Sequence, residues 1–219
     1  MQGVDVLCSS LYVETMNAKR ALRLALGLTL GRLAIGPLFL IVYMWYAAFA
    51  IPQIAMPFIL LVLLIVSELS DLFDGILARK WNQVTQLGKI LDPMADSIVR
   101  MAVFFTFTEG LIQLPLLLVF VFLYREVMIS TLRTVCALQG TALAARKSGK
   151  VKAIVQAVAA FAVVLLLIPY ALNVINLETL QQWSLLIVAF AAVYTLISGL
   201  EYTYVHWPDI KKTWKSPQK

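Results

Sequence analysis

Four carboxylates gather in one short stretch of the chain and could do chemistry together. A segment of 26 residues holds Asp71, Asp74, Asp92 and Asp96, which are four of the 12 acidic side chains in the protein. The first two are three residues apart and the last two are four apart, spacings that place each pair on one face of a helix. Converging carboxylates repel one another unless a cation lies between them. Because hard divalent cations prefer oxygen ligands, the pattern predicts a metal site. In the alternative, the acids form surface ion pairs with Arg79, Lys80, Lys89 and Arg100.

Long apolar segments on both sides of this stretch must position it. Hydrophobic residues make up 61% of the 219 residues and charged residues only 14%, with a mean hydropathy of +0.86. This composition is typical of an integral membrane protein. Each spanning helix needs about 20 apolar residues. We therefore predict an all-α integral membrane protein with six transmembrane helices, over residues 28–50, 52–72, 94–110, 115–138, 151–174 and 183–204.

The basic residues indicate how these helices are oriented. The turns near Pro52 and over 110–115 and 173–182 contain no Lys or Arg, whereas the other ends of the spans are rich in both. The positive-inside rule then places both termini and the acidic cluster in the cytoplasm, as in a multi-pass protein of the inner (cytoplasmic) membrane. The net charge of +6 suits anionic lipids and anionic substrates, and we expect no nucleic-acid partner.

Three regions follow from this pattern. Residues 1–27 include a basic, amphipathic segment that is expected to lie along the membrane surface or to form a partly ordered leader. Residues 28–206 are expected to form the six-helix catalytic domain, and residues 207–219 a basic cytoplasmic tail. Residues 1–20 lack a continuous apolar stretch, so we expect the first span to serve as the insertion signal.

Eight residues around the acids have a fixed spacing, D-x2-D-G-x2-A-R-x8-G-x3-D-x3-D. The positions are filled in order by Asp71, Asp74, Gly75, Ala78, Arg79, Gly88, Asp92 and Asp96. This pattern resembles the signature of the CDP-alcohol phosphotransferases, the membrane enzymes of phospholipid synthesis. The resemblance implies transfer of a phosphatidyl group from a CDP-linked lipid to an alcohol, with release of CMP. So many matched positions favour this interpretation over surface ion pairs.

The same resemblance implies a role for each signature residue. The ligands of Mg²⁺ or Mn²⁺, with two ions implied, would be Asp71, Asp74, Asp92 and Asp96. The cytidine diphosphate would contact Asp71, Gly75, Ala78, Arg79 and Gly88. Asp96 would also act as the general base, because the acceptor hydroxyl must lose its proton as it attacks phosphorus. A homodimer is implied as well.

Two arginines in the fourth apolar segment point to the acceptor alcohol. Arg125 and Arg133 are eight residues apart, so they lie near the same helix face. Arginines inside an apolar helix indicate an anionic ligand or a buried partner. Together with 147–152, this region resembles the phosphatidylglycerophosphate synthase branch of the family, which joins CDP-diacylglycerol to sn-glycerol 3-phosphate. We therefore assign Arg125, Arg133 and Lys150 to the acceptor phosphate.

Several alternatives stay open at this point. Glu126 could pair with an arginine of the bundle, and the lysines of 147–152 could be ordinary loop residues. An inositol phosphate or phosphatidylglycerol, which would give cardiolipin, could replace glycerol 3-phosphate as the acceptor. From a different class, a divalent-cation transporter could use the same acids, although transporters commonly show duplicated halves and the acids occur once here.

Further candidates are Thr29 and Arg32, which resemble a T-x2-R element of relatives, and Lys147. Relatives often carry Pro-Asn before this Thr, and this chain does not. The aromatic residues Trp183, Tyr202, Tyr204 and Trp207 are expected at the membrane interface.

Overall fold

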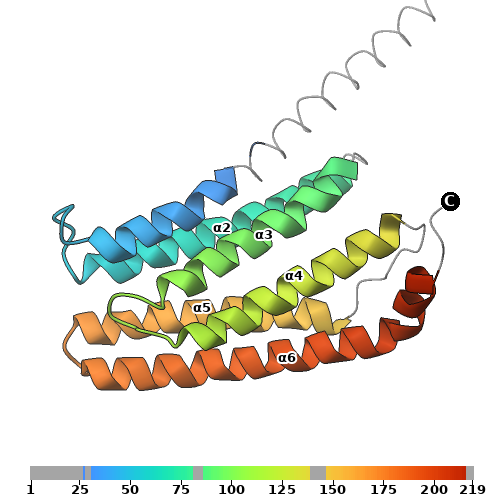
Figure 1. The fold of residues 1–219 in the computed structure, drawn as a ribbon. Helices are drawn as coiled ribbons and strands as arrows, with labels where there is room; N and C mark the ends of the chain where they lie inside the picture. The colour runs from blue at the N-terminus through green and yellow to red at the C-terminus, as the bar shows by residue number, and fades with distance from the viewer. Residues whose placement is uncertain (1–26, 28–30, 81–85, 139–146, 216–219) are drawn as a thin grey trace, which may run out of the picture.

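The computed structural model describes residues 27, 31–80, 86–138 and 147–215 (Figure 1). The described residues form six helices, which confirms the all-α prediction. The first helix is Gly31–Trp45. It is followed by α2 (Ala55–Lys80), α3 (Gln86–Thr106), α4 (Leu116–Leu138), α5 (Lys147–Ala171) and α6 (Leu177–Lys215).

The helices run roughly along one direction and form a bundle (Figure 1). The first helix lies with α2 and α3, while α4, α5 and α6 pack together as a second group. Contacts of α2 and α3 with α5, and of α3 with α4, join the two groups. The acid-bearing helices are therefore held directly against α4 and α5, which carry the basic residues singled out above.

The first helix packs closely on α3 and is hydrogen-bonded to the turn that follows α3. A Cβ added at Gly36 would lie 2.9 Å from the Cβ of Ala102, so the two helices approach closely only because residue 36 is glycine. The Tyr43 hydroxyl accepts hydrogen bonds from the backbone N–H groups of Leu111 (3.1 Å) and Ile112 (3.0 Å). It also donates to the Glu109 carbonyl at 3.2 Å. These bonds fix the turn between α3 and α4.

Two of the described helices are long and apolar enough to cross a membrane, Ser148–Ala171 and Leu177–Pro208. Gly31–Trp45 and Ala55–Ser70 are shorter apolar helices. Many large apolar side chains face outward, among them Leu117, Phe190 and Leu200, each about 70% exposed. Such a broad apolar exterior is unusual for a soluble monomer and suits contact with lipid.

The helix ends differ from the predicted spans in both directions. The first helix ends at Trp45, short of residue 50, whereas other helices continue beyond their apolar parts. The second helix extends to Lys80 rather than residue 72, and the third begins at Gln86 rather than residue 94. The last helix begins at Leu177, just after Asn176, whose side-chain oxygen accepts a hydrogen bond of 2.7 Å from the Thr179 N–H. It continues to Lys215, past the expected domain boundary at residue 206.

Candidate functional site

Both pairs of acids lie in helices, as their spacing predicted. Asp71 and Asp74 belong to the C-terminal part of α2, together with Gly75, Ala78 and Arg79. Asp92 and Asp96 belong to α3, together with Gly88. The side chains of residues 71–93 lie outside the described residues, and so does Thr29. Of the four acids, Asp96 is the one whose side chain lies in the described part of the chain.

The Asp96 carboxylate is held by an arginine one turn along α3. Nη2 of Arg100 donates to both Asp96 oxygens at 2.6 Å, and Nη1 donates to the Ala153 carbonyl of α5 at 3.3 Å. The ion pair proposed as an alternative thus exists for this one acid. Each carboxylate oxygen has a second lone pair, so the pairing with Arg100 leaves acceptor capacity for a metal ion or a proton.

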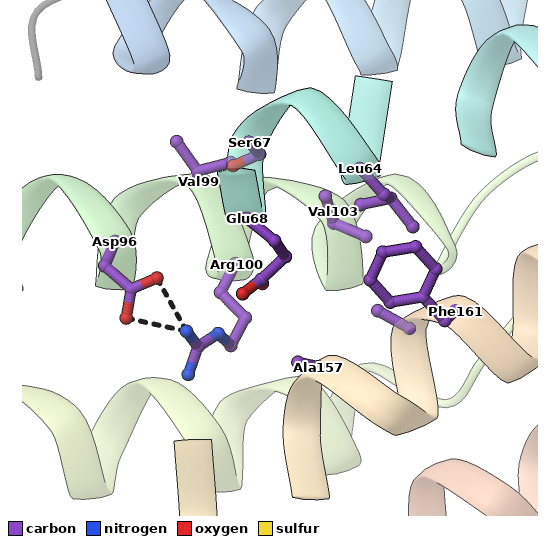
Figure 2. A pocket seen from close by; sticks show the side chains of 10 residues that line it. Leu64, Ser67, Glu68, Asp96, Val99, Arg100, Val103, Ala157 and Phe161 are labelled. Carbon is purple, nitrogen blue, oxygen red and sulfur yellow. Dashed lines mark hydrogen bonds and ion pairs between the residues drawn. The ribbon is translucent and has the colours of Figure 1, made fainter. Parts of the chain in front are cut away.

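A small cavity lies beside this pair, between α2, α3 and α5 (Figure 2). Its polar residues are Ser67, Glu68, Asp96 and Arg100, and its volume of about 20 Å³ is room for roughly one water molecule. Figure 2 shows Asp96 and Arg100 pointing toward each other, with apolar side chains such as Phe161 on the α5 side. The described cavity next to Asp96 is thus too small for a lipid or a nucleotide.

A much larger cavity, of about 710 Å³, lies on the α3–α4 side. Its charged lining consists of Arg125, Glu126 and Arg133, and hydroxyl groups come from Ser97, Ser130, Thr131 and Thr134. The remaining wall is mainly apolar, with Met94, Ile98, Met101, Phe105, Leu123, Val127 and Ile129. A cavity with a cationic part and an apolar wall suits an anionic group attached to or beside an apolar chain.

Arg125 has a buried partner. A buried partner was one of the two explanations that the sequence offered for an arginine in an apolar helix. Its Nη1 donates to Glu126 Oε2 at 3.2 Å, and its side chain is only 7% exposed. A Cβ added at Gly199 of α6 would lie 3.0 Å from Cγ of Arg125, so this glycine leaves room for the arginine stem. Arg125 nevertheless lines the large cavity together with Arg133. A buried partner and a ligand-facing position therefore coexist.

Arg133 is held from the opposite helix. Its Nε donates to the Tyr202 hydroxyl of α6 at 3.1 Å, and its Cζ lies 5.1 Å from the centre of the Tyr202 ring. Tyr202 is 1% exposed, so its ring faces into the bundle rather than outward, as an aromatic anchored among lipid headgroups would. Tyr202 faces α4 and gives Arg133 both a hydrogen-bond acceptor and a π face. These two contacts explain why the tyrosine is buried.

The lysines of α5 separate into two faces. Lys150 is exposed and is not among the residues that line the described cavities, whereas Lys152 is 5% exposed and donates to Glu126 Oε2 at 2.5 Å. Two residues along a helix correspond to about 200° of rotation, so these lysines point in nearly opposite directions. Lys147 begins α5 but its side chain is outside the described residues, and Arg32 is buried on the first helix away from the lining of these cavities.

Residues 22–199 match the model of the CDP-alcohol phosphatidyltransferase family. The chain belongs to this family. It is therefore a membrane transferase of phospholipid biosynthesis, and its chemistry is the transfer of a phosphatidyl group from a CDP-alcohol. The resemblance expected from the eight-residue signature is confirmed, and family membership favours an enzyme over a cation transporter.

Three relatives share one name, CDP-diacylglycerol--glycerol-3-phosphate 3-phosphatidyltransferase. The protein of Bacillus subtilis is 31% identical over 190 residues, covering 84% of this chain and 95% of the relative. That of Wigglesworthia glossinidia brevipalpis is 33% identical over 189 residues, covering 84% and 94%. That of Escherichia coli K12 is 36% identical over 138 residues, covering 60% and 71%.

CDP-alcohol phosphatidyltransferases generally use a divalent metal, and the donor set on α2 and α3 is chemically suited to one. It consists of carboxylates at helical spacing on two helices, and the described member, Asp96, keeps free lone pairs beside Arg100. Oxygen-rich sites of this kind suit Mg²⁺ or Mn²⁺ and disfavour softer metals.

Sequence reasoning missed Lys152 and the inward position of Tyr202. Each makes its contact with a residue far along the chain, 26 positions from Lys152 to Glu126 and 69 from Arg133 to Tyr202. One signal in the sequence could have indicated a buried lysine. Lys150 and Lys152 must lie on opposite sides of a helix, so only one of them can point toward a buried partner.

Proposed function

We propose that this enzyme transfers the phosphatidyl group of CDP-diacylglycerol to sn-glycerol 3-phosphate, giving phosphatidylglycerophosphate and CMP. The observation that carries the acceptor assignment is the pair of arginines, Arg125 and Arg133, in the lining of one large cavity beside α3. The names of the relatives support the same acceptor. An acceptor that already carries a phosphate is the kind of ligand that a buried arginine and a half-buried one recognise together.

In this proposal Arg125 and Arg133 bind the acceptor phosphate, and the apolar wall of the cavity accommodates lipid. Lys150, on the exposed face of α5, is assigned to attracting the anion, and Lys147 lies one turn before it. The cytidine diphosphate is assigned to Asp71, Gly75, Ala78, Arg79 and Gly88. Thr29 and, on the first helix, Arg32 are assigned to further substrate contacts.

We assign metal binding to Asp71, Asp74, Asp92 and Asp96. When bound, Mg²⁺ or Mn²⁺ would neutralise the diphosphate and the charge on the departing CMP. Asp96 accepts the proton of the acceptor hydroxyl while that oxygen bonds to the lipid phosphorus and the bond to CMP breaks. Arg100 holds the Asp96 carboxylate in one orientation for this transfer.

The proposed setting is the inner (cytoplasmic) membrane, with six spanning helices, a cytoplasmic site and a homodimeric assembly. The outward-facing apolar side chains of α4 and α6 support a lipid environment. The basic residues at one end of the spans support the orientation.

An acceptor screen tests the proposal. Purified enzyme in detergent is given Mg²⁺ or Mn²⁺ and CDP-diacylglycerol, and CMP release is followed with sn-glycerol 3-phosphate, inositol phosphate or phosphatidylglycerol. We expect release that depends on sn-glycerol 3-phosphate. Release with another acceptor alone would keep the family chemistry and overturn the proposed acceptor.

A further inference from the structure

Glu126 joins three helices through one carboxylate. Its Oε1 accepts a hydrogen bond of 2.9 Å from Ser97 of α3. Its Oε2 accepts from Arg125 of α4 at 3.2 Å and from Lys152 of α5 at 2.5 Å. Ser97 directly follows Asp96 in α3, so this carboxylate links the helix of the proposed base to the arginine of the proposed acceptor site.

The charges in this cluster do not cancel. Arg125 and Lys152 contribute two positive charges within hydrogen-bonding distance of the single negative charge of Glu126. The two cationic side chains are only 7% and 6% exposed, so the surplus charge is poorly solvated. A surplus cation in a desolvated site is costly unless an anion completes it. The cluster is therefore built to receive an anion.

Arg125 also has a donor that the cluster leaves unused. Its Nε is buried and makes no hydrogen bond within the described protein, so a ligand in the large cavity that the side chain lines would meet the guanidinium through its Nη groups. Glu126 engages Nη1 and so fixes the plane of the guanidinium. A guanidinium fixed at one nitrogen presents its other donors in a defined direction, which is what recognition of a phosphate requires.

We propose that Glu126 is a positioning residue of the acceptor site, a role that rests on the proposed function. It orients the Arg125 guanidinium for the acceptor phosphate, keeps Arg125 and Lys152 from repelling each other, and ties both to α3 through Ser97. The acceptor phosphate is thereby held in a fixed relation to the helix that carries Asp96. Glu126 itself takes no part in bond making.

A simpler role for Glu126 would be to neutralise the buried Lys152. The two roles differ when both charges are removed together. In a Glu126→Gln/Lys152→Met double variant no buried lysine needs a counter-charge, yet Arg125 still lacks its carboxylate partner. Charge neutralisation predicts recovery of activity in the double variant, whereas positioning predicts that acceptor binding stays weak.

The experiment measures kcat and both Michaelis constants for Glu126→Gln, the double variant and a control. Glu178→Gln is the matched control, because Glu178 is an exposed glutamate of α6 whose side chain accepts a hydrogen bond from the nearby Gln182. We expect Glu126→Gln and the double variant to raise KM for sn-glycerol 3-phosphate about 10-fold. KM for CDP-diacylglycerol should stay within about 2-fold of the wild-type value. Glu178→Gln should have wild-type kcat and wild-type values of both Michaelis constants.

Thermal unfolding in detergent accompanies each assay. If Glu126→Gln alone fails to fold, the double variant carries the test, since it buries no unpaired lysine. A wild-type acceptor KM in the folded double variant, or an equal rise in both Michaelis constants, would overturn the positioning role. If wild-type enzyme turns over only with another acceptor, the proposed function fails, and the same variants are compared through the KM of that acceptor.

Discussion

The Arg133 guanidinium lies over the ring of Tyr202, with its Cζ 5.1 Å from the ring centre, and its Nε donates to the Tyr202 hydroxyl at 3.1 Å. This contact joins α4 to α6 at the lining of the large cavity. It fixes the Nε and one face of the guanidinium of a residue that lines the large cavity. Tyr202 thus orients Arg133 much as Glu126 orients Arg125.

Replacing Tyr202 separates its two contacts with Arg133. Tyr202→Phe removes the hydrogen bond and keeps the ring, so we expect KM for sn-glycerol 3-phosphate to rise about 3-fold. Tyr202→Leu removes both contacts and should raise it about 10-fold, with little change in KM for CDP-diacylglycerol. Steady-state kinetics with each substrate varied in turn checks this. Equal KM values in the Phe and Leu variants would show that the ring contributes nothing.

Arg133 and Lys150 should differ sharply in their effect on acceptor binding. Arg133 lines the cavity, whereas Lys150 is exposed. We expect Arg133→Ala to raise acceptor KM by about 10- to 100-fold, as loss of a charge-assisted contact does. Lys150→Ala should cost about 2-fold, and the effect should disappear at high salt because exposed charges are screened. A large, salt-independent effect of Lys150→Ala would place that lysine in direct contact with the phosphate.

Asp96 is expected to be essential for turnover. Asp96→Asn keeps the shape of the side chain and an acceptor oxygen for Arg100 but cannot take a proton, so kcat should fall by about 10²- to 10⁴-fold. Binding of CDP-diacylglycerol, measured by titration of the purified protein, should change much less. Full activity of this variant would exclude Asp96 as the base.

The remaining acids should report on the metal. Asp71→Ala and Asp74→Ala should each shift the Mg²⁺ or Mn²⁺ dependence of activity to higher concentrations, because each removes one proposed oxygen ligand. A metal titration of activity, with Glu178→Gln as the control, checks the shift. An unchanged metal dependence with reduced kcat would argue against these two residues as ligands.

The sequence predicted the helices well because an apolar helix is recorded locally, in a run of about 20 apolar residues. It failed at their ends, since polar residues such as those from Gln86 onward continue a helix without any apolar signal. The spacing of the acids is also a local pattern, and both pairs do lie in helices, as that spacing predicted.

The basic part of the site was less predictable because it depends on which helices become neighbours. Arg125 and Arg133 share a face by spacing alone, and both line one cavity. The partnership of Lys152 with Glu126 requires α5 to pack beside α4 in one rotation, which no local pattern records. Only the structure could therefore show that Lys152, and not Lys150, pairs with Glu126.

Close packing of the first helix on α3 gives a test that is independent of the chemistry. A methyl group at residue 36 would lie 2.9 Å from the Ala102 Cβ, so Gly36→Ala should force the helices apart and destabilise the protein by about 1–3 kcal/mol. Ala102→Gly removes the methyl group that it meets. We expect the Gly36→Ala/Ala102→Gly double variant to recover much of the loss, measured as the midpoint of thermal unfolding in detergent. Additive losses in the double variant would contradict this contact, because residues that touch should show coupling.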